Sequence, residues 1–575
     1  MAYFLKKSTN KKGLYLQIYE SFYDPTKKQT AHRSIKAIGY EHELRDQGFD
    51  DPIAFWQQQV KDMNAQRDIE KVKNRVRKIS CDTPERMLGH FPLKAVHDAL
   101  DTRHDLVLLQ LMGGFKFSLH DMLCDLIYAR ACDPCSKSKT YNEVLPCLYG
   151  ATQTYSLDQL YRGLEYLGSE YEKVIEIYNA HVDRILTRDT SHTYFDCTNF
   201  YFEIDAEDAF RKKGPSKERR ADPLVSMGLL LDGSLLPLNM KLFSGNESEK
   251  PVLRESLQTT KQKCHIKGKT VCIADKGLNC ADNIYSLILQ NDGYIFSKSP
   301  KQLPKKELAW VFNKEGWTQV YHKDKSIAYE IKSVIDEFPY TLKDADGHKK
   351  EVFLKEKRIV TFNPSLQRKQ LQEISRQVER ARSLRVAGAK RQEYGDCAKY
   401  VSFNVIDENG EIGDDSIVVS LNHEAIARAK KFAGYNMIVT SEIAMKDQDI
   451  YDIYHNLWRI EESFKQMKSQ LDARPVYLQK QETITAHFLI CYLAVLLERI
   501  FQFKVLNNTY STEDITNLIK NYRIVEESAN KFINISRSSE LLDELEKKYS
   551  IPVNNYYLTK KQVDSILNCK ILSTS

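Results

Sequence analysis

The sequence predicts a mixed α/β protein whose central sheet is built from the middle of the chain, with helical regions before and after it. The chain has 575 residues, 42% of them apolar and 28% charged. This composition is typical of a folded protein, and the length allows about three to four domains. Strand-like and helical segments alternate between residues 187 and 505, which indicates an α/β or mixed sheet.

The first 186 residues are expected to hold a basic β-hairpin and then helices. GLYLQIY (13–19) alternates as a strand does, and TAHRSIKAIG (30–39) returns after a turn, so the hairpin region is 1–40. Residues 41–186 show the apolar spacing of helices, the last of them over 157–186. The basic run at 71–78 suits either a nucleic-acid backbone contact or a solvated helix face.

Residues 187–300 are expected to form the first part of the sheet. The order strand, hairpin, strand, helix, strand is predicted from SHTYFDCTNFYFE (191–203), a pair of strands within 224–243, TVCIAD (270–275), a helix over 281–290 and GYIFS (293–297). Residues 301–434 read as a β-rich insertion that contains a helix over 365–384. Its basic run RKQLQEISRQVERARSLRVAGAKR (368–391) has eight basic and two acidic residues, which favours nucleic-acid contact slightly over a solvated helix.

Residues 435–505 are expected to complete the sheet region. YNMIVTS (435–441) is a strand, a helix follows over 447–471, and an apolar helix over 482–504 is expected to pack in the core. Residues 506–575 are expected to be peripheral helices.

Charge and apolar patterning restrict the class of protein. The net charge of +6 permits a polyanionic partner without requiring one. The first ten residues lack the apolar core of a secretory signal, and the longest apolar stretch is shorter than the ~18–20 residues that span a bilayer. We therefore expect a cytoplasmic protein with no membrane segment.

The twelve cysteines are scattered through the chain and are expected to stay reduced. Cys132 and Cys135 form a CxxC pair, with His120, Cys124 and Cys147 nearby. A structural zinc site usually needs a second pair at matching spacing, so ordinary buried or loop thiols are the favoured interpretation.

Two aspartates occupy unusual positions. Asp196 lies inside an aromatic strand, and Asp275 ends an apolar one. A carboxylate among apolar strand residues needs a cation, hydrogen-bond donors or a metal ion, because an unpaired buried charge costs several kcal/mol. The alternatives are an exposed strand position for Asp196 and a turn cap for Asp275.

A third acid lies in the helix predicted over 447–471. Tyr454, Glu461 and Lys468 are seven residues apart, so they share one face of a continuous helix. This face places Glu461 among apolar neighbours, although an ordinary core helix is the alternative. Together with the two aspartates, Glu461 would make an all-oxygen site suited to Mg²⁺ or Mn²⁺ and to phosphoryl transfer.

The chain resembles bacterial insertion-sequence transposases of the DDE class, a cut-and-paste group with a Tyr-Arg-Glu-Lys signature around the glutamate. The similar segments are YFDCTNFYF (194–202), LPLNMKLFSGNESE (236–249), IADKGLN (273–279), YHNLWRIEESFKQMK (454–468) and ACDPCSKSKTYNEV (131–144).

The resemblance implies a ribonuclease-H-like core in which Asp196, Asp275 and Glu461 are catalytic and hold two Mg²⁺ ions, for which Mn²⁺ can substitute. It also implies that Tyr454 and Lys468 contact DNA. The arginine position of the signature is Leu457, and Arg459 is the alternative carrier of that guanidinium. Further DNA contacts are expected from Lys298, Arg376, Arg380 and Arg382.

The implied activity is metal-dependent cleavage at transposon ends, followed by attack of the freed 3′-hydroxyl on target DNA. The implied partners are the inverted-repeat ends, bound by the helical region 41–186 and the hairpin, the target DNA and a second copy of the chain in a homodimer. The implied location is the bacterial cytoplasm, at the nucleoid when DNA is bound. The alternatives are an inactive, domesticated DNA-binding relative and a ribonuclease-H-like nuclease that cleaves without joining.

Overall fold

The computed structural model describes residues 2–24, 29–75, 85–216, 221–263, 265–343, 348–386, 391–405, 417–528 and 530–572. The chain forms two compact units, Met1–Pro84 and Glu85–Ser575. Of the basic run at 71–78, residues 76–78 lie outside the described residues, as do the side chains of 71–75.

A three-stranded antiparallel sheet and two helices form the first unit. Its elements are β1 (Tyr3–Asn10), β2 (Gly13–Asp24), β3 (Gln29–Tyr40), α1 (Glu41–Asp46) and α2 (Pro52–Arg75). The sequence predicted β2 and β3 but not β1, whose polar residues pair along β2. The Asn64 amide of α2 holds the start of β1, because it accepts from the Tyr3 N–H at 2.8 Å and donates to the Tyr3 carbonyl at 2.9 Å.

Helices dominate residues 85–186 of the second unit. The elements are β4 (Glu85–Met87), α3 (Phe91–Leu100), α4 (Arg103–Met112), α5 (Leu119–Cys132), α6 (Lys137–Lys139), a π-helical turn (Thr140–Val144), a 3₁₀ turn (Leu145–Cys147), α7 (Leu157–Ser169) and α8 (Tyr171–Ile185). The single helix predicted over 157–186 is wrong: α7 and α8 are separated at Glu170, whose backbone leaves helical geometry with φ −101° and ψ 19°.

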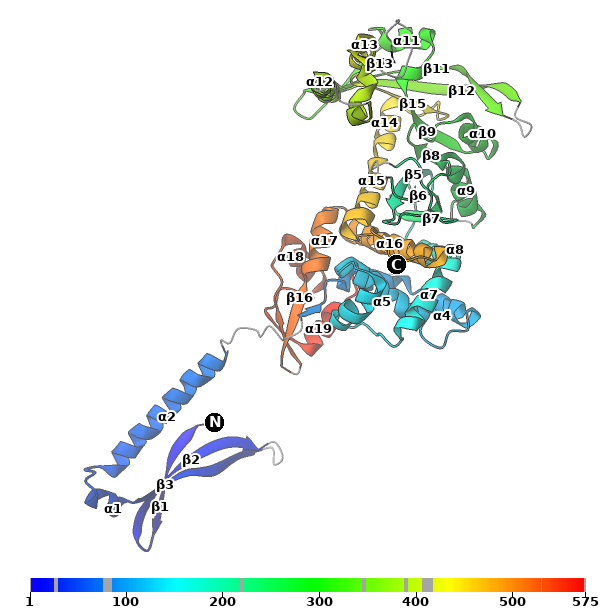
Figure 1. Ribbon diagram of the computed structural model, residues 1–575. Coiled ribbons are helices and arrows are strands. Elements are labelled where there is room, and N and C mark those ends of the chain that lie inside the picture. The colour runs from blue at the N-terminus through cyan, green and yellow to red at the C-terminus, as the bar shows by residue number, and fades with distance from the viewer. Residues whose placement is uncertain are drawn as a thin grey trace. The chain divides into compact units, whose positions relative to one another are not determined.

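A nine-stranded mixed sheet is the centre of the second unit (Figure 1). Its order is β10-β11-β12-β15-β9-β8-β5-β6-β7. The strands are β5 (His192–Tyr201), β6 (Leu224–Asp232), β7 (Pro237–Ser244), β8 (Val271–Ala274), β9 (Gly293–Lys298), β10 (Thr318–Tyr321), β11 (Ile327–Lys343), β12 (Lys349–Phe362) and β15 (Tyr435–Thr440). The pairs β5–β8 and β8–β9 are parallel, and the other neighbours are antiparallel. The predicted mixed sheet is confirmed.

The strands expected to form an insertion extend this central sheet. β12 pairs with β15 along Lys357–Phe362, so β10, β11 and β12 continue the sheet at its edge. The remaining elements of this region are a 3₁₀ turn (Pro300–Gln302), α11 (Lys305–Phe312), α12 (Pro364–Val386), a 3₁₀ segment (Arg391–Tyr400), β13 (Val401–Val405), β14 (Ile417–Leu421) and α13 (His423–Lys431). β13 and β14 form a separate two-stranded pair.

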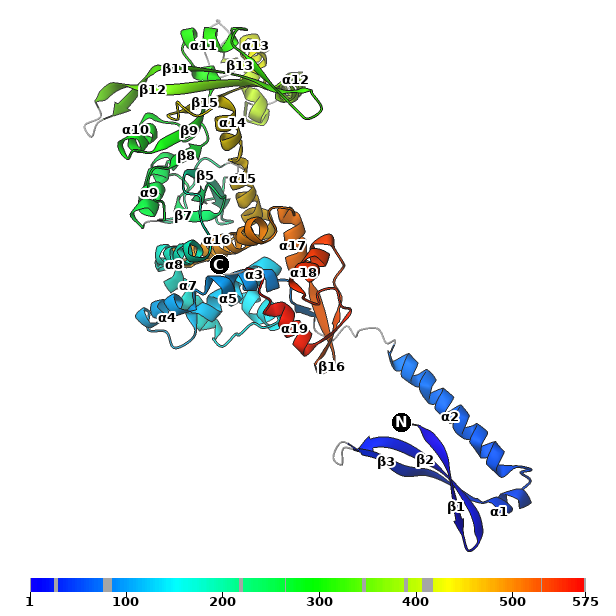
Figure 2. The same ribbon diagram turned by 180° about the vertical axis from the view of Figure 1, so that it is seen from behind.

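Helices cover both faces of the sheet (Figures 1 and 2). α9 (Glu249–Gln262) and α10 (Ala281–Leu289) enclose one apolar core that includes Phe195 and Ala274. Tyr194 and Ile273 belong to the core on the other face, where α14 (Asp447–His455), α15 (Trp458–Lys465) and α16 (Gln481–Ile500) lie.

The helix predicted over 447–471 is not continuous. α14 and α15 are joined through Asn456 and Leu457, where N–H groups bond three residues back, and a π-helical turn (Gln466–Gln470) follows α15. The Leu457 N–H donates to the Tyr454 carbonyl at 3.0 Å, and the Ile460 N–H to the Leu457 carbonyl at 3.1 Å. These tighter bonds change the rotation per residue between Tyr454 and Glu461.

α16 is the central helix of the second unit, in contact with α3, α5, α7 and β7. With the π-helical turn Phe501–Val505 it forms a segment, Gln481–Val505, that is long and apolar enough to cross a membrane, with a mean hydropathy of 1.7. That apolar window is completely buried inside the structure, as the prediction of core packing required.

The C-terminal region contains strands as well as the predicted helices. Its elements are α17 (Thr512–Asn521), β16 (Arg523–Ser528), β17 (Lys531–Asn534), α18 (Glu540–Tyr549), β18 (Tyr557–Thr559) and α19 (Lys560–Leu567). β4 joins the three strands in the order β18-β17-β16-β4, so the purely helical expectation was wrong.

Candidate active site

Asp196 and Asp275 directly follow the last paired residues of two parallel strands, with Asp196 inside β5 and Asp275 just after the end of β8. The register of β5 and β8 runs to the pair Phe195 and Ala274, so the two aspartates are the next residues on each strand. Because side chains alternate along strands, both share the face of Tyr194 and Ile273, two residues earlier. That face is the one on which α14 and α15 lie. Both aspartates are half-buried.

Asp275 is held by two hydroxyl groups. Its Oδ1 accepts from the Ser297 hydroxyl on β9 at 2.7 Å and from the Tyr454 hydroxyl on α14 at 3.4 Å. These bonds aim the carboxylate at α14 and leave its second oxygen for another ligand.

Glu461 acts electrostatically on the same tyrosine. Burial raises the pKa of Tyr454 to about 12, a hydrogen bond with Ser297 opposes this, and the charges of Asp275 and Glu461 add to it. Tyr454 therefore stays protonated at neutral pH and can donate a hydrogen bond. Glu461 itself is exposed, so its expected position among apolar neighbours was wrong; the changed rotation between Tyr454 and Glu461 is the reason.

The neighbouring Glu462 is half-buried and points toward the interior contacts instead. Its Oε2 accepts from Arg459 and from Arg499, each at 3.1 Å, and its Oε1 accepts from the Thr512 hydroxyl at 3.0 Å. The Arg459 guanidinium also lies 3.9 Å from the ring centroid of Trp458. Arg459 is thus engaged in an internal ion-pair network, and its role as a DNA contact stays a prediction.

Lys468, in the π-helical turn Gln466–Gln470, lies against strand β5 beyond Asp196. Its Nζ is 5.4 Å from the ring centroid of Phe200, four residues after Asp196 on the same strand. The side chains of Tyr454 and Lys468 therefore both reach the sheet, at Asp275 and at Phe200, despite the interruptions of the helix between them.

A cavity of about 400 Å³ opens beside Asp275 and Tyr454. It is bordered by four lysines, namely Lys276, Lys298, Lys301 and Lys399. Burial, together with the charge of Arg358, lowers the pKa of Lys298, whose Nζ lies 5.4 Å from the Tyr340 ring centroid. Several lysines thus border the cavity next to Asp275, an arrangement that suits the binding of a polyanion close to this carboxylate.

One face of α12 also lines this cavity, through Gln370, Glu373 and Gln377. The predicted DNA-contacting arginines of this helix are exposed; Arg376 pairs with Glu373 at 2.8 Å and Arg382 with Glu379 at 3.3 Å. Arg380 is exposed as well.

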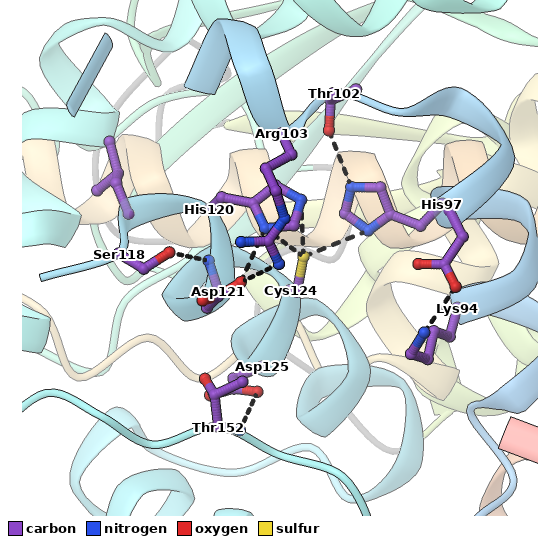
Figure 3. A network of polar contacts seen from close by, with 12 residues as sticks. Lys94, His97, Thr102, Arg103, Ser118, His120, Asp121, Cys124, Asp125 and Thr152 are labelled. Atoms are coloured by element: carbon purple, nitrogen blue, oxygen red, sulfur yellow. Dashed lines mark hydrogen bonds and ion pairs between the residues drawn. The ribbon is translucent and has the colours of Figure 1, made fainter. Parts of the chain in front are cut away.

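Figure 3 shows a second cluster of metal-ligating side chains, in the helical region. His97, His120 and Cys124 are, within the described part of the chain, the one group of three such residues whose ligand atoms all lie within 4.8 Å of one another. Asp196, Asp275 and Glu461 do not form such a group among the described residues.

Hydrogen bonds account for the cluster in Figure 3. Figure 3 shows the contacts of His97 with the Thr102 hydroxyl at 3.3 Å and with the Cys124 sulfur at 3.6 Å. Each ring nitrogen also has a tyrosine hydroxyl as a partner, Tyr128 at 3.1 Å and Tyr178 at 2.7 Å. Burial lowers the pKa of His97 to about 3, with His120 adding to the effect, and burial raises the pKa of the Cys124 thiol. Neutral imidazoles and a protonated thiol are the stable forms, so we interpret the cluster as a polar network of the core.

Comparison with known families identifies the domain that carries these carboxylates. Residues 188–497, more than half of the chain, match the family described as the transposase DDE domain. The chain belongs to this transposase family. The matched span contains Asp196, Asp275 and Glu461. No curated protein matches the chain.

Among solved structures, the chain is similar to the piggyBac transposase in a cryo-EM structure of its synaptic complex with hairpin DNA. The identity is 8% over 75% of this chain and 77% of that chain, with a TM-score of 0.37. This similarity is too low to equate individual residues.

Sequence patterns missed several residues of the site in this transposase family member. Ser297 is the last but one residue of β9 and looks like an ordinary polar residue, and only the pairing of β8 with β9 brings it to Asp275. Lys276, Lys301 and Lys399 come from three separate loops and turns. Their positions in the sequence carry no signal that they border one cavity.

Proposed function

We propose that the chain is an active DNA transposase of the insertion-sequence type, which cleaves DNA at transposon ends and joins the freed 3′-hydroxyl to target DNA. The observation that carries the proposal is the placement of Asp196 in β5 and of Asp275 directly after the adjacent parallel strand β8, on the face covered by α14 with Tyr454 and α15 with Glu461. This placement lies within the span matched to the DDE domain.

The three acids fit a pair of divalent ions, because hard cations prefer carboxylate oxygen and water. Asp196, Asp275 and Glu461 would hold Mg²⁺ or Mn²⁺, which supplies activation of the attacking oxygen and charge stabilisation at the leaving one. The protein fixes Asp275 through Ser297 and Tyr454. Tyr454 keeps its proton and can also donate to a phosphate oxygen.

Cationic groups on both sides of the acids would position the DNA backbone. Lys298 and the other cavity lysines lie on one side, and Lys468 follows β5 on the other. We propose that Tyr454 and Lys468 are the tyrosine and lysine of a Tyr-Arg-Glu-Lys signature. Action on two ends would require a homodimer on the DNA, in the bacterial cytoplasm.

A cleavage and joining assay tests this function. The substrate is duplex DNA from the flanks of the gene, mixed with the purified full chain and Mg²⁺, with EDTA as control. Strand breaks together with joined products are expected. Breaks without joining would indicate the alternative nuclease, and DNA binding without breaks in Mg²⁺ or Mn²⁺ would indicate an inactive relative.

The exposed arginines of α12 give a separate prediction for DNA binding. Replacing Arg376, Arg380 and Arg382 together by glutamine should lower the slope of log affinity against log salt by about one to three, because each backbone contact contributes about 0.9. Salt titration of duplex binding measures this slope. The exposed lysines 314, 323 and 325, changed together to glutamine, serve as a control of equal charge; equal slopes for both triple variants would mean that α12 faces solvent.

A further inference from the structure

A second cavity, of about 490 Å³, lies between the helical region and the segment that follows α15. Its walls include Arg130 near the end of α5, Lys137 at the start of α6, the segment 472–478 and His487 of α16. It shares no lining residue with the cavity beside Asp275.

Three basic side chains in this cavity are buried. Arg130, Lys137 and His487 are each at most 5% exposed. Arg130 donates to the carbonyls of Leu471 at 3.3 Å and Cys135 at 2.6 Å, but its Nε has no partner. The Lys137 carbonyl accepts from the Thr140 N–H, but the Lys137 amine has no hydrogen-bond or ion-pair partner among the residues that the structure describes.

The surroundings provide almost no negative charge. The other titratable groups that line the cavity are Lys139, Arg474, Tyr161, Tyr477, Cys135 and Asp472, and of these Asp472 is the one acid and is exposed. Burial and then the charge of Arg130 lower the pKa of Lys137 to about 7. Two cations buried without an acid beside them are costly, and an anion between them would remove that cost.

We propose that this cavity binds a phosphate group, supplied by the backbone of the DNA on which the transposase acts. The inference rests on the proposed function. A guanidinium and an ammonium group both bind phosphate oxygens well, and an unused Nε and an unpaired amine offer donors for them.

The path of β5 favours DNA as the source of the phosphate. Lys468 contacts Phe200, and the Arg474 guanidinium lies 5.0 Å from the ring centroid of the next residue, Tyr201. Strand β5 thus leads from Asp196 toward the cavity over five residues, roughly 17 Å at about 3.3 Å per residue. A DNA strand that leaves the acids along β5 would bring a phosphate about five nucleotides away to this cavity, at about 3.4 Å per nucleotide.

The test compares Lys137→Met with Lys173→Met, a control at an exposed lysine of α8. For a random-sequence duplex, Lys137→Met should weaken binding several-fold and lower the salt slope by about 0.9, the value for one backbone contact. The melting temperature of the free protein should stay equal or rise, because an unpaired buried cation is removed. Lys173→Met should leave the duplex affinity and the salt slope unchanged.

A second experiment measures the shift in melting temperature that inorganic phosphate causes, with chloride at the same ionic strength as the reference. It distinguishes binding of free phosphate from binding of a DNA backbone phosphate. If Lys137→Met loses a phosphate-induced shift but keeps the wild-type salt slope, the cavity binds free phosphate and the DNA assignment is overturned. If neither measurement changes, the site itself is overturned. Failure of the catalytic proposal is seen separately, because cleavage by the acid variants is measured independently of duplex binding.

Discussion

Asp275→Asn should abolish strand cleavage, by about a thousandfold or more, while duplex binding stays within a few-fold of the wild type. The amide keeps the shape of the side chain and can still accept from Ser297 and Tyr454, but it lacks the charge that holds a divalent ion. Asp196→Asn and Glu461→Gln should have the same effect, because each removes one carboxylate from the same set. Cleavage rates on duplex DNA from the flanks of the gene, in Mg²⁺ and in Mn²⁺, measure this.

Asp452→Asn is the matched control for these variants. Asp452 is an exposed acid on α14, two residues before Tyr454, so the same change of charge there should leave cleavage intact. Retained cleavage by a purified variant of Asp196, Asp275 or Glu461 would remove that residue from the proposed site.

Glu462→Ala should lower the free energy of unfolding by about 3–5 kcal/mol. Arg499, 1% exposed in its side chain, would lose the carboxylate that it contacts at 3.1 Å and would remain as a buried cation. Burial by itself would raise the pKa of Glu462, but the charge of Arg499 and the contacts with Arg459 and Thr512 together lower this pKa below its usual value. Urea unfolding at neutral pH, monitored by circular dichroism, measures the change.

Glu461→Ala is the control, since this neighbour is exposed. We expect its free energy of unfolding to stay within about 0.5 kcal/mol of the wild type. Variants of the two adjacent acids should therefore have different effects, because Glu461 is needed for cleavage and Glu462 for stability. A larger loss of stability for Glu461→Ala than for Glu462→Ala would show that the helix presents the opposite face.

The strands of the core and the acids within them could be predicted from local patterns. Asp275 ends a short apolar strand and Asp196 lies in an aromatic one, and both strands are where the sequence placed them. Their adjacency depends on the pairing of β5 with β8, which are separated by a hairpin and a helix. Such long-range pairing is set by tertiary packing and not by local periodicity.

The geometry of the helix that carries Glu461 also could not be predicted from local sequence patterns. The apolar spacing continues through residues 454–468, so the sequence predicts one helix. The tighter turn at Asn456 and Leu457 instead exposes Glu461 and leaves Glu462 half-buried. Contacts with Arg499 and Thr512, far along the chain, stabilise this choice. The buried basic residues Arg130 and Lys137 likewise line one cavity with His487 only in the folded protein.

The role of the three acids is tested most directly by anomalous diffraction from crystals of the protein grown with Mn²⁺. The proposed site predicts two manganese peaks about 3.5–4 Å apart, bound by carboxylate oxygens of Asp196, Asp275 and Glu461. Manganese bound elsewhere, with none at these carboxylates, would contradict the assignment of this site as the catalytic centre.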